Sequence, residues 1–183
     1  SGGDSDVLIV SSGATANATN IVSFTAGAGS SNSSGTVNLT TQTGGGTINM
    51  NAASGDYKIN GQGGVDSLTG GGGADIINGG ANADNISGGN GDDVLSGGAD
   101  NDSLTGGAGT ETFKVDVGTD TITDLGGASG GETDVLIVSA GATANATNIT
   151  SFTADSSTSN SGTANLTTKV GGGTIDIGNS TTG

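Results

Sequence analysis

The chain has 183 residues, of which 39 are Gly, and it contains no Pro, Cys, His or Trp. Acidic residues number 18 against 3 basic ones, which gives a net charge of -15 at pH 7. Without His or Cys, zinc sites with nitrogen or sulfur ligands and catalysis by an imidazole or a thiol are excluded. A 30% hydrophobic share with such a charge is typical of disordered chains, so an ordered fold needs a further source of stability.

The charge and the apolar pattern also restrict the partners. The only basic residues, Lys58, Lys114 and Lys169, cannot neutralise a phosphate backbone, so we expect no nucleic-acid partner. No apolar run approaches the roughly 18 residues of a membrane span, so we expect none. The chain starts Ser1-Gly2-Gly3, with neither an initiator Met nor a signal peptide, and we expect it to be an excerpt of a longer protein.

Residues 1–60 are predicted to form an irregular β module. Short apolar strands are expected at Val7–Val10, Ile21–Phe24, Val37–Leu39 and Ile48–Met50, separated by loops of Ser, Thr, Asn and Gly. The simplest arrangement is a wide solenoid coil that continues into the next segment, and a separate small β-sandwich is the alternative. Residues 52–60 look like a degenerate nine-residue block with Tyr57 at the acid position.

Residues 61–125 are organised in blocks of nine. Six blocks follow one another, from GQGGVDSLT (61–69) to GGAGTETFK (106–114), and residues 115–123 keep the register without the leading glycines. Each block has one apolar position, occupied by Leu68, Ile77, Ile86, Leu95, Leu104, Phe113 and Ile122. Each also has one acid position, occupied by Asp66, Asp75, Asp84, Asp93, Asp102, Glu111 and Asp120. A flexible Gly-rich linker has no reason to keep this periodicity.

Such blocks predict a coil of two short strands and two turns. Each strand consists of about three residues around the apolar position, whose side chain points inward, and glycines at the block start permit the turns. Acids 18 residues apart then stack about 4.8 Å apart in two columns and repel one another. Calcium relieves that repulsion best, because it accepts six to eight oxygen ligands in flexible geometry. Backbone carbonyls of the turns complete the shell, near Gly61, Gly63, Gly70, Gly72, Gly79, Gly88, Gly97 and Gly106. A solenoid without metal, in which Asp serves only as a turn residue, is the alternative.

The blocks resemble the RTX (repeats-in-toxin) nonapeptide, Gly-Gly-x-Gly-x-Asp-x-apolar-x. This resemblance covers residues 61–124 and implies a right-handed parallel β-roll that binds several calcium ions. Some blocks depart from the pattern: Asn82 and Asp100 replace the fourth-position Gly, Gln62 replaces the second, and Glu111 replaces the Asp. Residues 115–125 resemble the segment that ends such arrays.

A second repeat of about 128 residues is superimposed on the first. Residues 134–138 repeat residues 6–10, and residues 141–149 repeat residues 13–21 identically. We therefore expect a Gly-rich junction at 126–133 and a second copy of the N-terminal module at 134–183. Acids just before each copy, Asp4 and Asp6 and then Glu132 and Asp134, are weaker candidates for a calcium site; a solvated turn is the alternative.

A tandem array of calcium-stiffened β modules suggests a structural role outside the cell, where millimolar calcium fills weak sites. The resemblance implies a bacterial, type I secreted protein at the cell surface: a surface layer, an extracellular filament or an adhesin stalk. Self-association with further copies is expected, and cell-surface polysaccharide is a further candidate partner. The alternative is the calcium-binding tail of a secreted RTX enzyme whose catalytic domain lies elsewhere. We expect no catalysis in this chain, since neither His-Glu-x-x-His nor Gly-x-Ser-x-Gly occurs.

Overall fold

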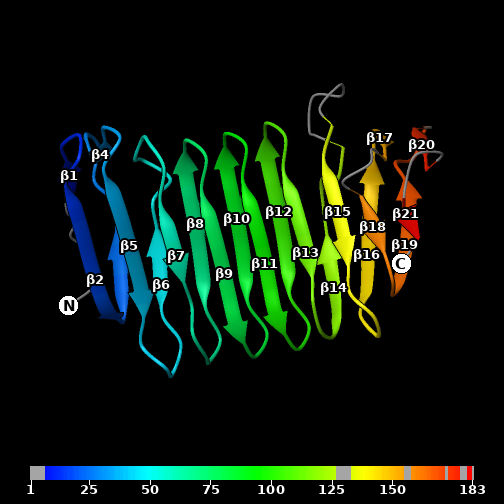
Figure 1. Cartoon of the computed structure of the whole chain (residues 1–183), viewed down its shortest axis with the longest axis horizontal. Helices are drawn as coiled ribbons and strands as arrows, with labels where there is room; N and C mark the ends of the chain where they lie inside the picture. The colour runs from blue at the N-terminus through cyan, green and yellow to red at the C-terminus, as the bar shows by residue number, and fades with distance from the viewer. Residues whose placement is uncertain (1–6, 127–132, 155–157, 172, 178–180, 183) are drawn as a thin grey trace.

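The computed structural model describes residues 7–126, 133–154, 158–171, 173–177 and 181–182 (Figure 1). These residues form a β-solenoid of about eight turns with no helix, so none that could span a membrane. Two long parallel sheets face each other, one of eight strands and one of nine, with a two-stranded sheet near each end. The all-β solenoid prediction is confirmed.

The N-terminal module forms the first coils of the same solenoid. Its strands are β1 (Ile9–Val10), β2 (Thr15–Ile21), β3 (Ser23–Thr25), β4 (Ser31–Asn32), β5 (Thr36–Thr41) and β6 (Thr47–Asn49). Strand β5 pairs with β7 (Lys58–Asn60) and β6 pairs with β8 (Ser67–Gly72), so both sheets continue without a break into the nonapeptide blocks. The module is therefore a solenoid and not a β-sandwich. Its coils are wider: hydrogen bonds join Leu8 to Ser30, 22 residues away, and Asn32 to Asp56, 24 away.

The nonapeptide blocks form a regular roll. Its further strands are β9 (Ile76–Ala81), β10 (Asn85–Asn90), β11 (Val94–Ala99), β12 (Ser103–Ala108), β13 (Thr112–Val115) and β14 (Thr119–Ile122). Ile86 stands opposite Leu68 on one side and Leu104 on the other, so one coil consumes 18 residues as predicted. The expected three-residue strands were too short, since β8 to β12 have six residues each. The glycine pair joins the strand because Gly89 stacks directly on Gly71 and Gly107 in the neighbouring coils.

Two files of apolar side chains, one from each long sheet, run along the inside of the roll. Seven block positions are at most 1% exposed: Leu68, Ile77, Ile86, Leu95, Leu104, Phe113 and Ile122. Their strand neighbours alternate with them toward the outside, as the period of two in a strand requires. Full burial of such a side chain contributes roughly 1.5–3 kcal/mol. Each coil of 18 residues contributes only two of these side chains, one from each sheet, so the core leaves much of the ordering entropy to be offset by other interactions.

The second copy of the module stacks directly on the end of the roll. Its strands are β15 (Val135–Val138), β16 (Thr143–Ile149), β17 (Ser151–Thr153), β18 (Ser159–Asn160), β19 (Thr163–Thr168), β20 (Thr174–Asp176) and β21 (Thr181–Thr182). Strand β13 pairs with β15 and β14 pairs with β16. The identical strands β2 and β16 nevertheless lie in opposite sheets. Successive modules are therefore rotated by half a coil about the solenoid axis.

Candidate metal centre

The block acids line the two edges of the roll, where the chain turns from one sheet to the other. In one column, a carboxylate oxygen of Asp84 accepts the backbone N–H of Asp66, and Asp102 accepts that of Asp84, both at 2.8 Å. Asp120 continues this column by accepting the N–H of Asp102 at 3.1 Å. These contacts join residues 18 apart, so they confirm the predicted stacking.

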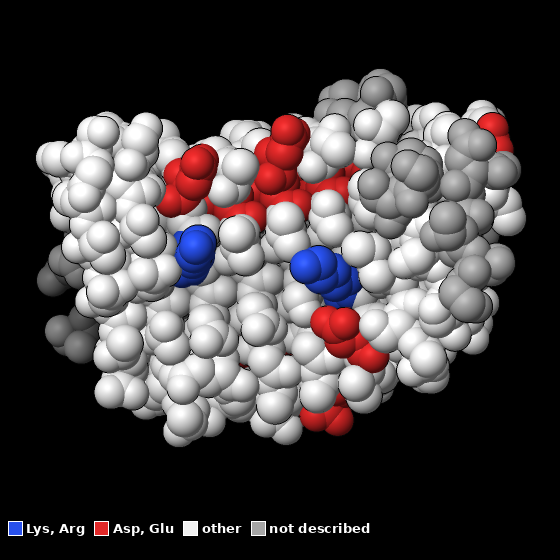
Figure 2. Space-filling model, in the orientation of Figure 1, with Lys and Arg blue, Asp and Glu red and all other residues white. Residues whose placement is uncertain are grey.

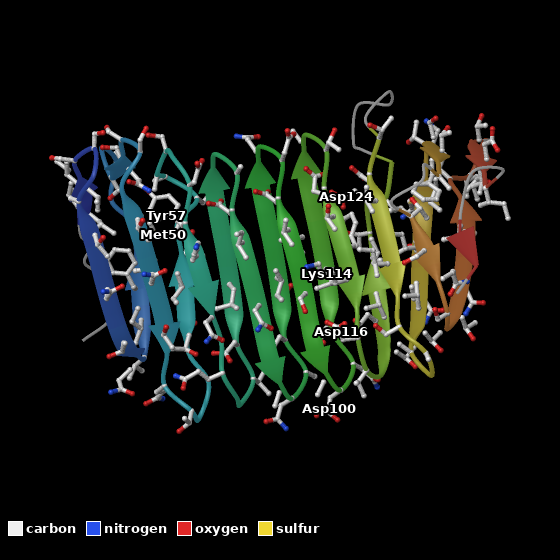
Figure 3. All side chains as sticks on the ribbon, viewed as in Figure 1. Met50, Tyr57, Asp100, Lys114, Asp116 and Asp124 are labelled. Atoms are coloured by element: carbon white, nitrogen blue, oxygen red, sulfur yellow. The ribbon has the colours of Figure 1, made fainter. Side chains whose placement is uncertain are left out.

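The opposite edge carries the second column. Asp93 accepts the N–H of Asp75 at 2.8 Å, and Asp75 accepts that of Tyr57 at 2.7 Å. Tyr57 thus occupies the acid position of the degenerate block, as the sequence suggested, and its hydroxyl donates to the carbonyl of Ser54. Asp124 and Asp100 mark the two opposite edges in Figure 3.

Each column carboxylate keeps one oxygen buried and without a hydrogen-bond partner. This holds for Oδ2 of Asp66, Asp75, Asp84, Asp93, Asp102 and Asp120, and for both carboxylate oxygens of Glu111. All seven residues are at most 3% exposed. A buried carboxylate oxygen without a partner is costly, because nothing replaces the water it has lost. The same unpaired atom recurs in every block, so these residues fit a row of cation-binding sites.

The block glycines leave the space in which these oxygens lie. A Cβ placed on Gly88 would overlap Oδ2 of Asp93 and would lie 2.8 Å from the carbonyl oxygen of Gly106 in the next coil. Gly70, Gly79 and Gly97 have the same relation to the acid of their own block. Carboxylate and carbonyl oxygens therefore meet at the first glycine of the block, which is the ligand chemistry that calcium prefers. Among the predicted carbonyl positions, Gly63 and Gly72 differ, since no carboxylate lies within 4 Å of a Cβ placed there.

The turn backbone explains the remaining glycines and their replacements. The second and fourth positions of the blocks have positive φ, for example 115° at both Gly89 and Gly91. Gln62, Asn82 and Asp100 stand at such positions and adopt φ of 64°, 74° and 79°. Asn and Asp tolerate this left-handed conformation better than other residues with a Cβ. These departures from the repeat therefore preserve the turn.

Comparison with known families agrees with this geometry. A family model described as the RTX calcium-binding nonapeptide repeat (4 copies) matches residues 58–86 and 87–122. Residues 58–122 of the roll carry RTX repeats. Such repeats are calcium-binding, and several ions are expected over the matched copies of the RTX roll. Neither the curated proteins nor the solved structures gave a match.

The RTX roll offers too few side chains to hold an ion by carboxylates alone. Within the described residues, no group of three or more Asp, Glu, His or Cys side chains is placed to hold a metal. An ion held between column carboxylates would therefore need backbone carbonyls as further ligands. Magnesium fits such a shell poorly, because it demands a tight octahedron and retains its waters.

The pKa values of the column carboxylates are raised, chiefly because burial disfavours their charged form. Burial raises the pKa of Asp75 to about 8, with the Asp93 carboxylate adding to the effect. Burial likewise raises the pKa of Asp120 to about 7 and those of Asp84 and Asp93 to about 6. The pKa values of Asp66 and Asp102 are raised for the same reason. A cation in the column would reverse these shifts, because it favours the charged form.

Glu111 and Asp134 end the second column where the coil widens. Asp134 accepts the N–H of Glu111, 23 residues away, at 2.9 Å and that of Gly126 at 2.6 Å. Burial and the neighbouring Asp134 charge raise the pKa of Glu111 to about 8. Asp134 thus joins the column, although both of its oxygens already accept backbone N–H groups. Asp4, Asp6 and Glu132, the other candidates for a junction site, lie outside the described residues.

Polar ladders outside the columns were missed by the sequence reasoning. Asp92 accepts the N–H of Thr110, and Asp56 accepts that of Ala74, both at 2.9 Å and both 18 residues away. Asp124 accepts the N–H groups of Gly106 and Gly107 at 2.8 and 2.9 Å. The signal was present, since each acid lies one coil length from an amide that it binds. Figure 2 shows acidic side chains along the upper edge of the visible face, isolated basic side chains near its middle and further acidic side chains below them.

Proposed function

We propose that this calcium-binding repeat protein is a load-bearing segment of an extracellular bacterial assembly, such as a surface layer, a filament or an adhesin stalk. The observation that carries the proposal is the continuity of the two long sheets through module, roll and second module. Parallel strand pairs join the first module to the roll and the roll to the second module, so calcium in the roll would stiffen the whole solenoid. The predicted Gly-rich junction at 126–133 lies, apart from its two end residues, outside the described residues. RTX repeats occur in secreted bacterial proteins, which supports an extracellular location.

In this proposal each calcium ion lies between successive members of a column. The unpaired Oδ2 atoms and the carbonyl of the first block glycine supply its protein ligands, and the ions offset the repulsion between stacked carboxylates. Calcium binds the folded coil and not the open chain, so its binding free energy becomes folding free energy. The missing stability of an acidic chain with a thin core then has a source.

Association between segments would use the open ends of the solenoid. Strand edges at the ends of a sheet pair readily with other chains unless they are charged or covered. At the N-terminal end, Val7 and Ile9 are 58% and 69% exposed. These apolar side chains fit a contact between segments better than a solvated end.

The test is light scattering and electron microscopy of the chain in millimolar calcium and after chelation. Assemblies should form in calcium, dissolve with chelator, and be abolished by Val7→Lys combined with Ile9→Lys. Val65→Lys is the matched control, because Val65 is 71% exposed but lies on the roll, away from the ends. The tail of a secreted RTX enzyme would instead stay dispersed in calcium at high concentration, and that result would overturn the proposal.

A further inference from the structure

The two copies of the module share identical segments, but these segments differ in burial. Residues 7–10 and 13–21 recur identically at 135–138 and 141–149. In the second copy, Ala146 is fully buried, whereas Ala18 at the equivalent position is exposed. Leu136, Ala144, Ile149 and Phe152 are likewise buried, while their counterparts in the first copy are only partly covered. Since these segments are identical, the difference in their burial comes from what lies against each copy.

The last coil of the RTX roll is what covers the second copy. Ile122 stands opposite Ala146, and Val115 stands opposite Val138, in two parallel strand pairs. The backbone N–H of Glu111 adds a hydrogen bond to Asp134. This seam combines main-chain pairing with buried apolar contacts, which are the same two kinds of interaction that join the coils inside the roll.

No coil within the described residues covers the corresponding face of the first copy. Its end is hollow, with a cavity of about 370 Å³ lined by Leu8, Ala16, Ala18, Ile21, Phe24 and Leu39. The strand edge of β2 is unpaired on this side, since β2 is the terminal strand of the nine-stranded sheet. The face therefore offers both an apolar surface and free main-chain groups.

The opposite face of the module gives the converse comparison. In the first copy, Met50 is fully buried where β6 pairs with β8 of the roll. Its counterpart in the second copy, Ile177, is 60% exposed. Each module thus has one face that receives the end of a roll and another that supports the start of one.

We propose that the open face of the first module, made by Leu8, Ala16, Ala18, Ile21 and Phe24, seats the last coil of a further RTX roll in the same polypeptide. That coil would match residues 111–125 and precede Ser1. The inference rests on the proposed structural role and deepens it, because it specifies how consecutive units join. Since β2 and β16 lie in opposite sheets, each added unit is turned by half a coil, so the rod repeats in structure only after two units.

The test lengthens the full chain by one unit, placing a second copy of residues 1–128 ahead of Ser1. Hydrogen exchange of residues 10–21 is measured in millimolar calcium at a dilution where scattering shows no assembly. Each variant carries one substitution, made only in the module that follows the added unit. The changed mass of its peptide distinguishes that module from the added copy. Ala18→Glu places a charge on the seam, whereas Thr19→Glu is the matched control, because Thr147 at the equivalent position stays exposed in the covered copy.

In the Thr19→Glu chain, the labelled peptide should exchange at least about tenfold more slowly than the same peptide of the added unit, whose face stays open. In the Ala18→Glu chain, the two peptides should exchange alike. The proposal is wrong if the labelled peptide and the peptide of the added unit exchange at the same rate in the Thr19→Glu chain. It is also wrong if the labelled peptide is equally protected in both variants. Protection of residues 10–21 in the unlengthened chain that rises with concentration would assign the face to a second molecule instead. Because hydrogen exchange is measured on dispersed protein, its result can be interpreted even if the assembly test of the proposed function fails.

Discussion

Replacing one column carboxylate by its neutral isostere should have opposite effects with and without calcium. Asn at position 93 keeps an oxygen that can accept the N–H of Asp75, but it removes the buried charge. In the calcium-free chain, Asp93→Asn should therefore stabilise the roll. In calcium, the substitution should lower the binding affinity of the ions on either side of residue 93, because a neutral amide replaces a charged ligand.

The magnitude follows from the ionisation of Asp93 in the folded chain. Its pKa rises from 3.8 to about 6, chiefly by burial. At about 1.4 kcal/mol per pKa unit this corresponds to roughly 3 kcal/mol above pH 7, which screening by water and ions reduces to about 1–3 kcal/mol. In calcium, loss of one ligand charge should lower the affinity of each adjoining ion by at least about tenfold, or about 1.4 kcal/mol.

Circular dichroism and calorimetry measure the two effects. The calcium-free free energy of unfolding is obtained at pH 8 by urea, or by TMAO-driven folding if the stripped chain is unfolded. Calcium affinity is obtained by titration calorimetry. Asp92→Asn is the matched control, because Asp92 also accepts an N–H 18 residues away but is exposed. The reasoning is refuted if Asp93→Asn destabilises the calcium-free chain, or if both variants behave alike.

Three further predictions follow from the same columns. Acid should fold the calcium-stripped chain. The folded-state pKa values of Asp75, Asp84 and Asp93 are raised to about 6 to 8, so these groups contribute stability that is fully present below the unfolded value of 3.8 and is lost as pH rises through the folded-state values. The β signal in circular dichroism should therefore fall from about pH 5 to pH 8. A β signal that grows over this range would contradict it. Gly88→Ala should abolish calcium binding nearby, because the new Cβ would overlap Asp93, whereas Gly72→Ala, with its nearest contact at 3.5 Å, should bind calcium normally in titration. Asp84→Asn should lower calcium affinity more than Glu111→Gln. Asp84 lies between two column carboxylates that each have an unpaired oxygen, whereas Glu111 has only one such neighbour, because both oxygens of Asp134 already accept backbone N–H groups. Equal losses of affinity would count against ions shared between neighbouring carboxylates.

The candidate site could be read from the sequence because its geometry is periodic. A nine-residue block with one apolar and one acid position fixes which side chain points inward and which stacks at the edge. The 18-residue coil, the two acid columns and the place of Tyr57 in one of them all follow from that period, and the structure bears them out. The calcium chemistry follows from the residue types, since oxygen ligands alone are available.

The strands of the modules were less predictable, because their sequence has no comparable period. The expected strands Ile21–Phe24 and Val7–Val10 are replaced by β2, β3 and a shorter β1. Strand β2 extends through Thr-Ala-Asn-Ala-Thr-Asn, with Asn20 at a φ of 57° and a register shift between Ala18 and Ile21. Such an irregular strand depends on pairing with β5, which lies beyond any local pattern.

The sequence by itself determined the repeat, the inward files, the acid columns and their preference for calcium, because these depend on spacing and residue type. Only the tertiary structure decided that modules and roll share two sheets, that each block acid keeps at least one unpaired buried oxygen, and that identical segments of the two modules differ in burial. These features depend on which coil lies against which. Ala18 and Ala146 have the same neighbours in sequence, and only the coil that packs on each of them sets its environment.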